Sequence, residues 1–154
     1  MKAGKLLSVD KLTVYADRIV ALVSVDVKKA YTTPELAKQA LEQRPSLAHH
    51  TCINEKGPTF AAVVEHTPLP HLFEHVIVDI LSQESMDYAE SGETASVFPK
   101  DESVENPSSG LVVGTSEWLD RKVGTARVEV SYQDDLVALA AFKSAEEFLN
   151  NMTA

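Results

Sequence analysis

The pentapeptide His71-Leu72-Phe73-Glu74-His75 carries the residue types with the clearest chemistry in this sequence. Two histidines four residues apart lie on one side of a helix and can hold one metal ion. Their order, H-x-x-E-H, is the inverse of the H-E-x-x-H of many zinc proteases. Glu74, one turn after the first histidine, stays close enough to activate a metal-bound water. The pattern therefore predicts metal-dependent hydrolysis, with His71 and His75 as ligands and Glu74 as the general base.

Further metal donors lie close to this motif in the sequence. All five histidines fall between positions 49 and 75, together with the single cysteine, Cys52. A catalytic zinc site takes three protein ligands and leaves a position for water. We expect His50 to be the third ligand, because the segment that ends at Cys52 must fold back near the helix of the motif. Asp79, one turn past His75, is predicted to orient a ligand ring, and Cys52 is interpreted as a small packing residue.

The helix that presents the motif is predicted from Leu69 to about Gln83. Its apolar residues form one broad stripe that faces the core: Leu69, Leu72, Phe73, Val76, Ile77, Ile80 and Leu81. His71, His75 and Asp79 fall on the opposite side. Two interpretations of that side stay open at this point, a metal site and a solvated polar helix face.

Strands are predicted where β-branched and apolar residues dominate or alternate with polar ones. Arg18 to Val27 is predicted to be a mostly buried strand, and Lys11 to Tyr15 a short strand or an arm. Leu111 to Val113 and the alternating stretch Ala126 to Tyr132 are predicted to be two more, and we expect a β-hairpin before the last helix.

Other helices follow from capping and proline signals. Thr33 and Pro34 begin a helix that runs to about Gln43. Shorter helical pieces are predicted for residues 46–50 and, with a strand as the alternative, for residues 60–65. Asp134 or Asp135 begins a final helix that ends near position 150. These elements together predict an α/β (α+β) fold, a two-layer sandwich in which helices pack on one face of a mainly antiparallel sheet.

A strongly acidic stretch follows the helix of the motif. From Glu84 to Glu105, Lys100 is the only basic residue among many acidic ones. The glycines and prolines of this region and the lack of a helical stripe predict a surface loop at about residues 84–110. Such a loop is either a mobile insertion or a rim that attracts cationic groups of a substrate.

The composition indicates one domain that spans residues 1–154 and is long enough to bury a core. We expect a cytoplasmic protein, because the chain has one cysteine, no signal peptide and no apolar run that could cross a membrane. The net charge of −9 argues against nucleic acid and anionic membranes as partners and suits a positively charged substrate. The oligomeric state, including a homo-oligomer, stays open.

Three stretches resemble the N-terminal domain of cyanophycin synthetases. They are residues 44–52, which contain His50-Thr51-Cys52, residues 58–60, and residues 70–81, which contain the H-x-x-E-H motif. The family shows E-H-x-C, then a turn, then G-H-V-I-E-H-V-A-L-E-L-Q in the same order. The resemblance covers roughly residues 18–83 and 124–150.

This resemblance implies a domain that binds a polymer of aspartate with arginine side chains, and that in some members resembles a zinc metallopeptidase and cuts the polymer. In the family an ATP-grasp domain and a Mur-ligase-like domain follow, so this chain is not expected to act as a ligase by itself. Matching positions make His71 and His75 metal ligands and Glu74 the catalytic carboxylate, and His50 matches as well. Asp79 stands where the family usually has glutamate, Pro70 replaces a family glycine, and residues 84–123 do not match.

The function predicted from these observations is zinc-dependent hydrolysis of amide bonds in a cyanophycin-like or arginine-bearing peptide. The alternative is a non-catalytic binding module that holds such a polymer or a partner protein. A third interpretation is a structural relative of the family in which the histidine face has lost its function.

Overall fold

The computed structural model describes residues 5–52, 57–90 and 112–152, and the side chains of residues 84–90 are not among the described features. One antiparallel sheet has the strand order β1-β2-β4-β3. The strands are β1 Leu7–Val14, β2 Arg18–Val25, β3 Gly114–Asp120 and β4 Thr125–Ser131. The helices are α1 Pro34–Gln43, α2 Leu69–Glu90 and α4 Asp135–Asn151. This architecture confirms the predicted α+β fold with an antiparallel sheet and helices packed against it.

The sheet has one face toward the helices and one toward solvent. In β4, Ala126, Val128 and Val130 are buried, and the residues between them are partly exposed, as the alternating sequence predicts. The hairpin between β3 and β4 turns at Gly124, which has a φ of 87°. A Cβ atom there would lie 2.4 Å from the carbonyl oxygen of Val25, so the turn requires glycine.

The two helices outside the motif begin and end where the capping signals predict. The side chain of Thr33 accepts a hydrogen bond from the backbone N–H of Leu36 at the start of α1, and Pro34 occupies the first turn. The Asp134 carboxylate accepts hydrogen bonds from two backbone N–H groups at the start of α4. These caps set the ends of the helices that pack around α2.

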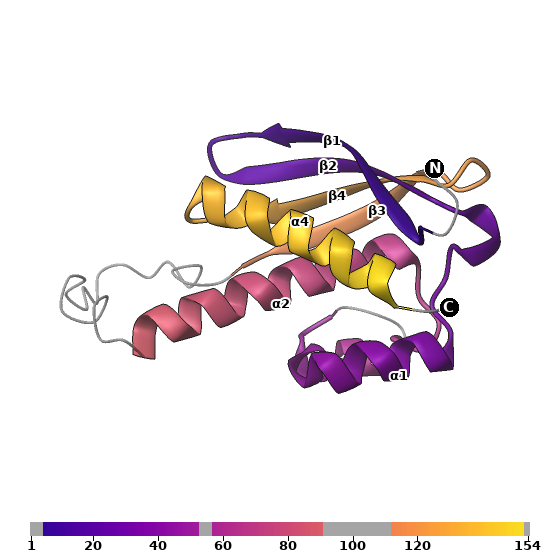
Figure 1. The fold of residues 1–154 in the computed structure, drawn as a ribbon, viewed down its shortest axis with the longest axis horizontal. Helices are drawn as coiled ribbons and strands as arrows, with labels where there is room; N and C mark the ends of the chain where they lie inside the picture. Colours follow the sequence, from indigo (N-terminus) through magenta and orange to yellow (C-terminus); the bar gives the residue numbers. More distant parts are fainter. Residues whose placement is uncertain (1–4, 53–56, 91–111, 153–154) are drawn as a thin grey trace.

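Helix α2 is buried on more sides than its sequence predicts. One side packs against β3, β4 and α4, and Figure 1 shows α1 and its neighbouring segment on the side away from the sheet. The predicted apolar stripe is in the core, with Phe73 and Ile77 fully buried. The interpretation of the histidine side as a solvated face is wrong, because His75 is 5% exposed and Asp79 1%. The segment between α1 and α2 covers that side.

Several predicted boundaries need correction. Helix α2 continues to Glu90, so residues 84–90 are helical and not part of a loop, whereas the rest of the predicted acidic loop lies outside the described residues. Val112 and Val113 are not in a strand. The observed strand in this region is β3, which begins at Gly114 and was not predicted from the sequence. Strand β1 begins at Leu7 and pairs along its length with β2, so it is not an arm. Among the described helices, none combines the length and apolarity needed to cross a bilayer.

Candidate metal centre

Three atoms that could bind a metal ion meet where α2 faces the segment before it. They belong to Cys52, His71 and His75, and all lie within 4.8 Å of one another. The Nε2 atoms of the two histidines are 3.1 Å apart, and the Cys52 Sγ is 3.5 Å from His71 Nε2. A tetrahedral zinc ion places two ligand nitrogens about 3.4 Å apart and a nitrogen and a sulfur about 3.6 Å apart. The cluster could therefore hold a metal ion.

Backbone pairing between residues 50–52 and 58–60 carries Cys52 to the helix. The Cys52 N–H donates to the carbonyl of Pro58 at 3.1 Å, and the Phe60 N–H donates to the carbonyl of His50 at 2.9 Å. The fully buried ring of Phe60 stacks on His75 at a centroid distance of 4.0 Å and meets His71 edge-on at 5.1 Å. Phe60 therefore fixes the planes of both candidate ligand rings from one side.

The other ring nitrogens of the two histidines also have partners. Thr67 Oγ1 lies 2.8 Å from His71 Nδ1, and His50 Nδ1 lies 3.0 Å from His75 Nδ1. A ligating histidine usually uses its second nitrogen in this way, which sets the ring orientation and the tautomer. The two Nε2 atoms are left to face each other and Cys52.

His50 and Asp79 lie on the Nδ1 side of His75, away from the three candidate donor atoms. His50 Nε2 is 3.0 Å from Asp79 Oδ1, and Arg44 donates to the same carboxylate at 2.7 Å. The hydroxyl of Ser46 also donates to this carboxylate. Burial raises the pKa of Asp79, but the hydrogen bonds from His50, Ser46 and Arg44 outweigh it and lower this pKa below its ordinary value. The ring that Asp79 contacts is that of His50. The structure does not bring His50 into the group of three donors.

Burial favours the neutral form of both candidate ligand histidines. Burial, followed by the charges of His71 and His50, lowers the pKa of His75 to about 3. Burial also lowers the pKa of His71. Because only a neutral imidazole has a free lone pair for a metal, protons compete weakly with a metal ion at this site.

Glu74 lies beside the donors and not among them. Its Oε2 is 3.7 Å from His75 Nε2, and the side chain is hydrogen-bonded to Ser116 of β3. Burial raises the pKa of Glu74 to about 7, although the hydrogen bond with Ser116 acts in the opposite direction. A carboxylate with a pKa near neutrality can both accept and return a proton, which a general base in hydrolysis must do.

The backbone of β3 leaves room for Glu74 through Gly114. A Cβ atom at this position would lie 2.8 Å from Glu74 Cγ and 2.9 Å from its Oε2. We expect Gly114→Ala to push the carboxylate away and to lower the free energy of unfolding by about 1–3 kcal/mol. Chemical denaturation of the metal-free protein, followed by circular dichroism, measures this change.

A double-mutant cycle separates this contact from a general effect on β3. If Gly114→Ala acts through Glu74, its cost should largely disappear in a Glu74→Ala background, where the methyl group has space. An equal cost in both backgrounds would show that Gly114 does not position Glu74.

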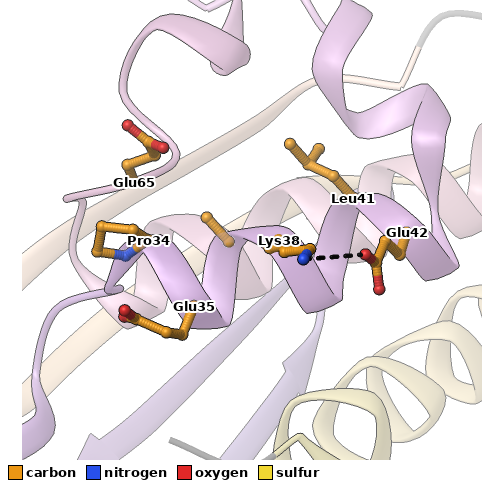
Figure 2. Close-up of a pocket in the computed structure, with 7 residues that line it drawn as sticks. Pro34, Glu35, Lys38, Leu41, Glu42 and Glu65 are labelled. Atoms are coloured by element: carbon orange, nitrogen blue, oxygen red, sulfur yellow. Dashed lines mark ion pairs between the residues drawn. The ribbon is translucent and has the colours of Figure 1, made fainter.

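A second concave region lies on α1, away from the metal donors. Figure 2 shows Glu35, Lys38 and Glu42 of α1 around it, with Glu65 on the opposite rim. Lys38 pairs with Glu42 at 3.9 Å. The hollow has a volume of about 560 Å³ and includes none of the three candidate ligands. It therefore contributes nothing to the candidate metal site.

Comparison with protein-family models, with curated proteins and with solved structures finds no match to this chain. The sequence analysis counted Cys52 among the possible donors but interpreted it as a packing residue and chose His50 as the third ligand, whereas the structure places Cys52 with His71 and His75. Sequence reasoning also missed Phe60, Thr67 and Ser116, whose contacts with the motif depend on tertiary packing that spacing does not reveal.

Proposed function

We propose that this chain is a zinc-dependent hydrolase of amide bonds in a cyanophycin-like or other arginine-bearing peptide. Cys52, His71 and His75 are the proposed ligands, and Glu74 is the proposed base. The observation that carries the proposal is the set of three donor atoms within 4.8 Å of one another, with the Glu74 carboxylate 3.7 Å from one of them.

The donor set favours zinc over other common ions. One thiolate and two imidazoles suit zinc, whereas magnesium and calcium prefer oxygen ligands. Three protein ligands are also the number typical of catalytic zinc sites. When bound there, zinc would act as a Lewis acid toward a carbonyl and lower the pKa of a water molecule.

The protein's own groups supply the remaining steps. In the proposed reaction Glu74 would take a proton from the attacking water and return it to the leaving nitrogen, and its hydrogen bond with Ser116 would hold the carboxylate on the side of β3. His71 is partly exposed, whereas Cys52 and His75 are buried. A substrate would therefore approach from the side of His71.

The choice of substrate rests on two properties of the sequence. The resemblance to the N-terminal domain of cyanophycin synthetases supports a polymer that carries arginine side chains. The net charge of −9 is favourable for a substrate rich in guanidinium groups.

The burial of the cluster favours a second candidate function. Cys52 is 8% exposed, and Glu74 and His75 are each 5% exposed. A zinc ion in such a site could tie the segment around Cys52 to α2, and the domain would then bind the polymer or a partner protein without cutting it.

A cleavage assay tests the proposal and separates the two candidates. The protein is stripped with a chelator and assayed with and without one equivalent of zinc on polyaspartate that carries arginine side chains. Unmodified polyaspartate is the control substrate. We expect new amino groups only with zinc and only from the arginine-bearing polymer. Binding without cleavage would support the second candidate, and neither binding nor cleavage would contradict both.

A further inference from the structure

We propose that His50 and Asp79 are positioning residues that keep the proton of His75 on Nδ1 and so leave its Nε2 lone pair free for the metal. This inference rests on the proposed zinc site. It assigns to His50 a role other than that of the third ligand predicted from the sequence.

The order of hydrogen bonds from Asp79 to His75 carries this inference. The Asp79 carboxylate can only accept, so His50 Nε2, at 3.0 Å, must donate to it. A neutral His50 then has a lone pair on Nδ1, which lies 3.0 Å from His75 Nδ1. The proton between these two atoms must therefore belong to His75. The result is a His75 ring whose Nε2 is unprotonated and points toward His71 and Cys52.

If the hydrogen bond between His50 and His75 ran in the opposite direction, His50 would have to be cationic. That ring would donate to both Asp79 and His75, and the proton of His75 would move to Nε2, where it blocks metal binding. Arg44 makes this arrangement unnecessary, because its guanidinium already pairs with the Asp79 carboxylate at 2.7 Å. The rings of His50 and His75 lie 5.2 Å apart, so the direction of the hydrogen bond between them decides which nitrogen of His75 carries its proton.

Asp79 is itself held too firmly to serve as a metal ligand. It is 1% exposed and accepts hydrogen bonds from Arg44, Ser46 and His50. Its oxygens are thus occupied on the side of His75 away from the donor cluster. The carboxylate acts on the metal site through His50.

Nitrogen-15 NMR of the metal-free full chain reads the tautomer of each histidine directly. Two-bond couplings between ring carbon-bound protons and nitrogen distinguish a protonated from an unprotonated nitrogen. We expect Nδ1–H for His75 and Nε2–H for His50 in the wild type. This readout does not depend on activity or on bound zinc, so it tests the inference even if the proposed function fails.

Variants then test whether His50 causes the tautomer. In His50→Ala we expect His75 to shift toward Nε2–H and the zinc affinity to fall by about 10–100-fold, as for other groups that orient a ligand. Asp79→Asn should change both in the same direction by less, because the amide oxygen still accepts from His50. His49→Ala is the matched control, since this neighbouring histidine is exposed, and it should change neither property.

Two results would overturn the inference. One is a wild-type His75 that carries its proton on Nε2. The other is a His50→Ala protein with an unchanged His75 tautomer and a zinc affinity within twofold of wild type. If His50→Ala does not fold, as judged by circular dichroism, Asp79→Asn decides by the same criteria. Absence of zinc binding in the wild type, with His75 as Nδ1–H, would contradict the proposed function and leave the positioning role intact.

Discussion

Replacing His75 with alanine is expected to weaken zinc binding by more than about 100-fold, because loss of a ligand should exceed the effect of losing a group that only orients one. The same change should lower the free energy of unfolding of the metal-free protein by about 2–5 kcal/mol, as other large-to-small changes in a core do. His75 is 5% exposed and stacks under Phe60 at 4.0 Å. Its removal would leave a cavity between α2 and Phe60.

Zinc titration against a chromophoric chelator and chemical denaturation measure these two effects. His66→Ala is the control, because His66 is exposed and stacks on Tyr31 outside the donor cluster. It should leave the zinc affinity unchanged. Equal zinc affinities of His75→Ala and wild type would remove His75 from the site.

The second large effect is expected for Glu74→Gln. The amide cannot take a proton from water, so zinc-dependent cleavage should fall by about 10²–10⁴-fold. Zinc affinity should stay within a few-fold, because Glu74 is proposed as the base and not as a ligand. The amide has nearly the shape of the carboxylate, so contacts with Ser116 and Gly114 can be kept.

Initial rates on the arginine-bearing polymer and zinc titration of the same samples test this separation. Glu65→Gln is the matched control, an exposed glutamate outside the metal cluster, and it should retain full activity. A loss of zinc affinity in Glu74→Gln as large as the loss of rate would show that Glu74 is a ligand. Full activity would exclude it as the base.

The sequence was sufficient for those parts of the fold that depend on local signals. The caps at Thr33 and Asp134 set the starts of α1 and α4, and the alternation in β4 gave its buried face. Strand β3 was missed because Gly114 and Ser116, which alternate with polar residues ahead of Trp118, supply none of the apolar pattern typical of a strand. Its pairing with β4 and packing against α2 determine its structure, and these contacts are not local.

The candidate site was predicted in part for a similar reason. The helical spacing of His71 and His75 places their side chains together whatever the rest of the chain does. The positions of His50 and Cys52 depend on how residues 50–60 fold over the helix. The two residues are two positions apart in an extended segment, yet Cys52 reaches the donor cluster and His50 lies behind His75. A short spacing alone could not distinguish ligand from supporting residue.

Zinc K-edge X-ray absorption of the wild-type protein, loaded with one equivalent of zinc, tests the proposed site most directly. We expect one sulfur ligand at about 2.3 Å and two imidazole nitrogens at about 2.0–2.1 Å, with the remaining position filled by a light atom. Cys52→Ser should remove the sulfur signal. A protein that retains no zinc after gel filtration, or a zinc ion without a sulfur ligand in the wild type, would contradict the assignment of Cys52, His71 and His75 as the metal centre.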